Sequence, residues 1–80
     1  MLEALKTEKK VVGIKQLKRA LEADRAETVF LAEDADPALT EPLRRLCEDK
    51  RVRCIAVQTM RELGTACGIA VGAAAAATVR

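Results

Sequence analysis

The 80-residue sequence lacks several side chains on which common protein functions depend. It contains no histidine, serine, asparagine, tryptophan or tyrosine, and Phe30 is its only aromatic residue. These absences exclude a histidine base, a serine nucleophile and a histidine-ligated metal. They also exclude recognition of single-stranded nucleic acid by stacking bases on a series of aromatic side chains.

Long apolar segments and patterned cysteines are absent as well. The most apolar stretch, residues 69–79, is shorter than the roughly 20 residues that a membrane-spanning helix needs. The first residues have neither the basic region nor the continuous apolar run of a signal peptide. Cys47, Cys54 and Cys67 are an odd number of cysteines without C-x-x-C spacing, which favours a reducing compartment. We therefore expect a cytoplasmic protein with no membrane partner.

The residues that are present indicate one small globular domain over residues 1–80. Half of them are hydrophobic and 32% are charged, which is a balance typical of a chain with a single core. The net charge is only +2, but residues 6–19 carry six basic side chains against one acidic, while residues 20–50 carry nine acidic against four basic. A basic pole beside an acidic one is typical of a protein that meets an anionic polymer with one side.

Apolar spacing predicts alternating helices and strands. We expect helices over residues 2–6, 14–23, 37–50 and 59–68, and strands over residues 11–12, 28–32, 52–57 and 73–79. The alanines of the last predicted strand have a high intrinsic propensity for helix. We nevertheless expect a strand there, because strands and helices alternate along the chain and the last helix needs a further strand to pack against. This alternation of helices and strands along the chain predicts an α/β protein, with the architecture of a three-layer α/β/α sandwich.

Two of these helices carry start signals. Asp36 followed by Pro37 predicts a cap and a first helical residue, and Thr59 with Glu62 fits the capping box. We expect the helix over 37–50 to bury four apolar residues, namely Leu39, Leu43, Leu46 and Cys47.

The first candidate site is the start of the helix that follows Gly13. A glycine lets the backbone approach a ligand, and the free N–H groups of a first helical turn attract anions. Lys15, Lys18 and Arg19 share one helix face, opposite the apolar face. Together with the Gln16 amide they suit contacts to phosphates and to guanine edges. From the residues alone, a merely solvated helix face is the more frequent reason for such a pattern.

The second candidate lies between Gly68 and Gly72. Ile69, Ala70 and Val71 fit either an exposed loop that packs on a ribose or an unstacked base, or a strand that begins inside the core. Exposed aliphatic side chains usually need a partner, so the sequence alone favours the strand.

Two further patterns are weaker. Glu33, Asp34 and Asp36 could hold Mg²⁺, but an acidic cluster before Pro37 is better explained by the positive end of a helix, so we expect no metal and no cofactor. Cys47 and Arg53 match the C-x₅-R spacing of cysteine phosphatases. The acidic residues between them would repel phosphate, so we do not expect an enzyme.

Taken in order along the chain, three segments resemble the kink-turn RNA-binding ribosomal proteins, the archaeal "L-seven-Ae" group and above all its small bacterial members. The segments are Gly13–Gln16, Ala32–Pro37 and Leu63–Ala75. The resemblance implies a mixed four-stranded sheet. It also implies binding to the kink-turn, an RNA bend with a three-nucleotide bulge and tandem sheared G·A pairs.

The resemblance assigns roles to both candidate sites. Gly13, Ile14, Lys15 and Gln16 would meet the G·A pairs with help from Arg19, and the loop of Ile69, Ala70 and Val71 would cover the bulged nucleotides. The basic side chains that would support phosphate contacts are Lys9, Lys10 and Lys18. Ile14 departs from the threonine of archaeal members and Ala70 from a common glutamate, so affinity and sequence preference are expected to differ.

The leading hypothesis is therefore a monomeric protein that binds a structured RNA containing a kink-turn, in an rRNA or an mRNA leader, and that is ribosomal or ribosome-associated. The alternative is a protein-interaction module of the same fold that has lost RNA binding. The third and weakest hypothesis is a small phosphatase that uses Cys47 and Arg53.

Overall fold

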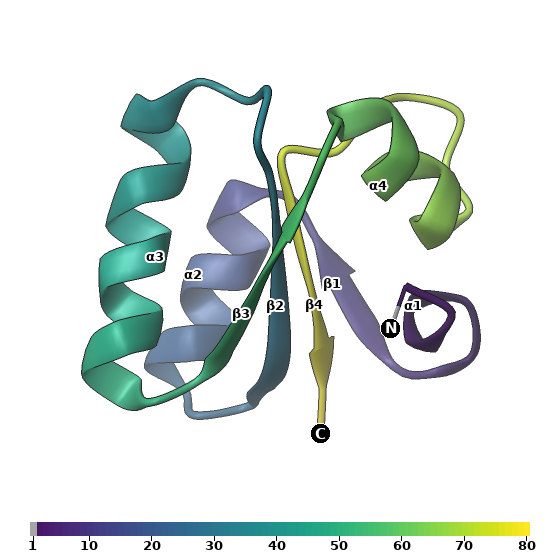
Figure 1. The fold of residues 1–80 in the computed structure, drawn as a ribbon. Helices are drawn as coiled ribbons and strands as arrows, with labels where there is room; N and C mark the ends of the chain where they lie inside the picture. Colours follow the sequence, from purple (N-terminus) through teal and green to yellow (C-terminus); the bar gives the residue numbers. More distant parts are fainter. Residues whose placement is uncertain (1) are drawn as a thin grey trace.

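The computed structural model describes residues 2–80, so Met1, the first residue of the expected domain, lies outside it, as does the side chain of Thr7. Helices and strands alternate along the chain as predicted (Figure 1). The elements are α1 (Ala4–Thr7), β1 (Lys10–Val12), α2 (Ile14–Glu22), β2 (Ala26–Ala32), α3 (Pro37–Lys50), β3 (Arg53–Val57), α4 (Met60–Cys67) and β4 (Ala75–Val79).

The four strands form one mixed sheet in the order β1-β4-β2-β3. Strands β2 and β3 are parallel, and β4 is antiparallel to both β1 and β2. Helices α2 and α3 cover one face of this sheet, and α1 and α4 cover the other (Figure 1). This arrangement confirms the predicted three-layer sandwich and the mixed sheet.

Each face of the sheet has its own core. Leu17 and Leu43 belong to the cluster under α2 and α3, whereas Phe30 and Leu63 belong to the cluster under α1 and α4. Successive residues of β2 alternate between the two clusters because strand side chains alternate in direction. The sheet is therefore covered on both faces, which fits the apolar character of its central strands.

The central strand β4 is where helix propensity fails as a guide. Ala75, Ala76 and Ala77 are fully buried between β1 and β2. Their small side chains let a helix layer approach the strand closely from each side, and this packing outweighs alanine's preference for helix. The predicted strand is confirmed from residue 75 onward, but Ala73 and Ala74 belong to the preceding loop.

Helix α3 corrects one predicted core position. Its buried stripe runs through Thr40, Leu43 and Cys47, at spacings of three and four residues. That stripe leaves Leu39 on the flank of the first turn with 47% exposure, so its predicted burial was wrong. Leu46 is half-buried.

Within residues 2–80, no helix combines the length and the hydropathy that crossing a bilayer would require.

Candidate functional site

The amino end of α2 begins at Gly13, which adopts φ 108° and ψ 157°. This backbone conformation is open to glycine and strained for other residues. The Gly13 amide donates to the Ala75 carbonyl at 2.9 Å, and the Gly13 carbonyl accepts from the Leu17 amide at 3.0 Å. No side chain within residues 2–80 caps this helix. Its first-turn N–H groups are therefore left for solvent or a ligand.

The side chains of α2 divide as the sequence predicted. Leu17 and Leu21 are buried and Ile14 is half-buried. The side chains on the other faces of the helix are exposed, namely Lys15, Gln16, Lys18 and Arg19. The first turn contains no acidic residue. Free N–H groups, the positive end of the helix dipole and three long cations therefore make this end attractive to an anion.

Helices α3 and α4 start differently. The Ala38 amide donates to the Asp36 carboxylate at 2.9 Å, and the Glu62 amide donates to the Thr59 hydroxyl at 3.0 Å. Both caps were predicted. The Met60 amide also donates to the Asp34 carboxylate at 2.8 Å. Asp34 thus caps α4 and not α3, a contact that sequence reasoning missed because the two residues are distant in the chain.

The loop between α4 and β4 is fastened to α4. Gly68 ends the helix with φ 78°, the Ile69 amide donates to the Gly64 carbonyl at 3.1 Å, and the Ala73 amide donates to the Met60 carbonyl at 2.9 Å. A Cβ atom at Gly64 would collide with the Val71 carbonyl oxygen, so the loop backbone lies directly against the helix.

This loop presents its apolar side chains to solvent. Ile69 is 37% exposed and Val71 is 72% exposed, and Ala70 is exposed between them. The exposed-loop interpretation is therefore correct, and the favoured strand at this position was wrong.

The loop and the amino end of α2 lie at the same end of the sheet (Figure 1). The hydrogen bond from the Gly13 amide to the Ala75 carbonyl joins the start of α2 to the first residue of β4. The Ala32 amide donates to the Ala74 carbonyl at 2.9 Å. The sheet order brings β4 beside β1, so two segments far apart in the sequence become neighbours. The structure thus places the starts of both candidate sites, Gly13 and the loop of Ile69–Val71, at the same end of the sheet.

The supporting cations are less concentrated than expected. Lys9 lies at the opposite end of the sheet, where its carbonyl accepts from the Val79 amide at 3.0 Å. Lys10 is half-buried and lies on the α1 and α4 side of the sheet, where burial raises the pKa of the Cys67 thiol and the Lys10 charge opposes that rise. Arg61, which was not among the predicted site residues, is exposed in the first turn of α4, beside the residue that fastens the loop. In the sequence alone, no pattern of neighbouring residues distinguishes Arg61 from the other cations.

The weaker patterns do not form sites. Within residues 2–80, no three metal-ligating side chains come together. Cys47 is 1% exposed inside α3, and a hydrogen bond shared with Cys54, together with burial, raises the pKa of its thiol. Because residues 47–50 are helical and Arg53 is on β3, no phosphate-binding loop joins Cys47 to Arg53. The phosphatase hypothesis was wrong.

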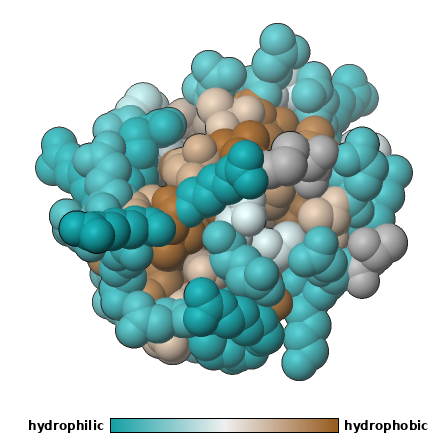
Figure 2. Space-filling model, turned by 60° about the horizontal axis from the view of Figure 1, so that its bottom comes forward, coloured by the Kyte–Doolittle hydropathy of each residue, from teal (hydrophilic) through white to brown (hydrophobic). Residues whose placement is uncertain are grey.

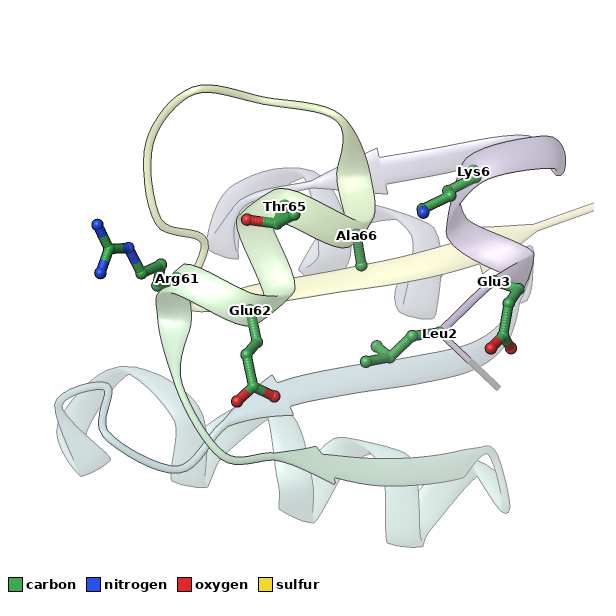
Figure 3. Close-up of a pocket in the computed structure, with 7 residues that line it drawn as sticks. All are labelled: Leu2, Glu3, Lys6, Arg61, Glu62, Thr65 and Ala66. Atoms are coloured by element: carbon green, nitrogen blue, oxygen red, sulfur yellow. The ribbon is translucent and has the colours of Figure 1, made fainter.

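A cavity of about 370 Å³ opens between α1 and α4 (Figure 3). Its lining residues are Leu2, Glu3, Lys6, Arg61, Glu62, Thr65 and Ala66. Figure 3 shows Leu2 reaching toward α4, while the Arg61 side chain points away. The cavity contains none of the predicted site residues, and its mixed charges favour neither sign of ligand.

Similar proteins are found by both sequence and structure. An RNA-binding protein of Bacillus pumilus is 46% identical over 67 residues, which cover 84% of this chain and 82% of the relative. The large ribosomal subunit protein eL8 of Halobacterium salinarum is 40% identical over 68 residues, which cover 84% of this chain and 57% of the relative.

Among solved structures, the 15.5kD RNA binding protein of Giardia lamblia superposes with a TM-score of 0.92 at 27% identity, covering 99% of this chain and 70% of that one. The model of the ribosomal protein L7Ae/L30e/S12e/Gadd45 family matches residues 1–80. RNA-binding proteins of this family are not enzymes, in agreement with the expectation from the sequence. On the strength of this match and of relatives above 40% identity, the chain belongs to the ribosomal protein L7Ae/L30e/S12e/Gadd45 family.

Proposed function

We propose that the protein binds RNA, and specifically RNA that contains a kink-turn, with the amino end of α2 and the loop over residues 69–71. The observation that carries the proposal is the uncapped, cationic start of α2, which is hydrogen-bonded through Gly13 to the strand that follows an exposed apolar loop. The names of the relatives support RNA as the partner, since several are RNA-binding proteins.

The chemistry of the two segments fits a bent RNA. The major groove of a regular RNA helix is too narrow for side chains, but a sharp bend opens it locally. Lys15 and Arg19 can then donate to guanine O6 and N7, while the Gln16 amide both donates and accepts. Ile69 and Val71 give the bulged nucleotides an apolar surface without aromatic stacking.

The likeness to a large ribosomal subunit protein supports a place on the ribosome or near it. We include in the proposal a cytoplasmic location and a monomeric state, with an rRNA or an mRNA leader as the source of the kink-turn. No cofactor enters this mechanism, because binding needs only donors, charge and an apolar surface.

A gel shift tests the proposal with a kink-turn RNA and a control RNA whose G·A pairs are replaced by Watson–Crick pairs. We expect wild type to prefer the kink-turn, and Lys15→Ala and Arg19→Ala each to lose about 1–3 kcal/mol of binding free energy. Arg45→Ala is the matched control, because Arg45 is an exposed cation in the middle of α3, on a helix that carries no candidate site.

Equal affinity of wild type for both RNAs would refute the proposal. Absence of binding at about 100 mM salt, beyond the weak non-specific level, would instead favour the protein-interaction module. In that case the exposed Ile69 and Val71 would be the contact with a protein partner.

A further inference from the structure

A second groove, of about 250 Å³, lies between α2 and the edge strand β1. Its lining residues are Val11, Gln16, Arg19, Ala20, Ala23, Arg25 and Val79. This lining combines four apolar side chains with one amide and two guanidinium groups, and it contains no carboxylate. The groove begins beside the open end of α2 and reaches Arg25, beyond the carboxyl end of that helix.

Further cations gather at the far end of this groove. The Val79 amide donates to the Lys9 carbonyl at 3.0 Å, and the Arg80 amide donates to the Arg25 carbonyl at 3.0 Å. Strand pairing thus brings together Lys9, Arg25 and Arg80, which are far apart in the sequence. Figure 2 turns this end of the molecule toward the viewer and shows hydrophilic side chains over most of the surface, with apolar patches between them.

The acidic residues at this end are Glu8, Glu22, Asp24 and Glu27, and none of them lines the groove. Asp24 is the carboxylate next to Arg25, and it accepts a hydrogen bond from Lys50 of α3 at 2.8 Å. Glu8 and Glu22 are exposed neighbours outside the groove lining. The lining of the groove itself therefore carries two positive charges, from Arg19 and Arg25, and no negative charge.

We propose that this groove is a second RNA contact, which takes the phosphodiester backbone of the stem that leaves the kink-turn. The proposal rests on the proposed function and extends the contact from the end of α2 along its side. From Gln16 to Ala23 the helix rises about 10 Å, the length of a few successive phosphates. Because backbone contacts carry no base information, the groove sets affinity and salt dependence, while the end of α2 sets selectivity.

The test compares wild type with Arg25→Gln on a kink-turn RNA that has a long stem, at about 50 and about 200 mM salt. Losing one phosphate contact lowers the slope of log affinity against log salt by about 0.7–0.9. Over this fourfold rise in salt, we expect the affinity of Arg25→Gln to fall about threefold less than that of wild type. The change should be equal for kink-turn and control RNA.

Two matched variants sharpen the test. Arg25→Lys keeps the charge and should keep the wild-type slope, whereas Arg45→Gln removes an exposed cation from α3 and should leave the slope unchanged. Thermal melting of each variant checks that it is folded. Shortening the stem should abolish the difference between Arg25→Gln and wild type.

An unchanged slope in Arg25→Gln, with kink-turn preference retained, overturns the groove proposal alone. Failure of wild type to distinguish the two RNAs overturns the proposed function, and the groove proposal with it.

Discussion

The amino ends of α2 and α4 lie at the same end of the sheet but are built in opposite ways. At α4, the Thr59 hydroxyl and the Asp34 carboxylate accept first-turn N–H groups, and the Met60 carbonyl accepts from the returning loop. At α2, Gly13 has no side chain to accept, and no other residue within 2–80 caps the helix.

This difference in capping assigns the two helix ends different roles: the amino end of α4 is part of the scaffold, and the amino end of α2 is part of the proposed site. A side-chain cap stabilises a helix by about 0.5–2 kcal/mol. Helix α4 has this stabilisation at its amino end, and α2 lacks it. The closed end of α4 holds the loop with Ile69 and Val71 in place, and the open end of α2 leaves its N–H groups and cations for a ligand. In the proposed RNA-binding surface, α4 would thus position the apolar loop and α2 would supply the donors and the cations.

The largest effect should come from Gly64→Ala. Its Cβ would meet the Val71 carbonyl oxygen, and a backbone atom cannot rotate away as a flexible side chain can. We expect a loss of about 3 kcal/mol in the free energy of unfolding, the upper end of overpacking costs. Urea unfolding measures this loss, and kink-turn affinity should fall with it. Thr65→Ala, an exposed neighbour on α4, is the control. Wild-type stability in Gly64→Ala would show that the loop does not lie on the helix.

A smaller loss is expected when the open end of α2 is altered. A Cβ at Gly13 would meet nothing within 4 Å, so Gly13→Ala suffers only from its backbone angles, which we expect to cost about 2 kcal/mol in thermal or urea unfolding. Gly13→Asp carries the same strain and adds a carboxylate at the helix end. It should bind kink-turn RNA about tenfold more weakly than Gly13→Ala, a difference of about 1.4 kcal/mol. Equal binding of the two variants would contradict an anion site there.

Removing the cap that α4 receives from Asp34 should cost about 1 kcal/mol. In Asp34→Ala the Met60 amide loses its acceptor, so its hydrogen exchange should accelerate. Asp36→Ala is the matched control, since it uncaps α3 at a similar cost and leaves the Met60 amide protected. Unchanged exchange at Met60 in Asp34→Ala would mean that the cap is not formed in solution.

The parts of the fold that the sequence predicted are those fixed by neighbouring residues. The start of α3 at Asp36 and Pro37, the Thr59 cap, and the division of α2 into buried and exposed faces all depend on residues within a few positions of one another. Local hydrogen bonds and helical periodicity are sufficient to fix them.

The parts that the sequence did not predict depend on distant partners. Asp34 caps a helix that starts 26 residues later, and Lys10 is directed away from α2 by the alternation of an edge strand that only the sheet order locates. Leu39 is exposed because α3 packs with its stripe turned toward Thr40. For the candidate site, the sequence identified two segments, but their location at the same end of the sheet follows from the pairing of β1 with β4.

The smallest effect concerns the carboxyl end of α2, where Asp24 is joined to Lys50 of α3 at 2.8 Å. The hydrogen bond from Lys50 and its charge hold the pKa of the Asp24 carboxyl below its usual value. A folded-state pKa below the unfolded value means that the pair stabilises the fold above the unfolded pKa and is lost as pH falls through the folded pKa. Because Asp24 is exposed, the gain in stability is small. In an NMR titration, the Asp24 midpoint should rise toward its ordinary value in Lys50→Gln. An identical midpoint in both proteins would mean that Asp24 is not tied to α3, and its charge would then oppose Arg25 at the end of the basic groove.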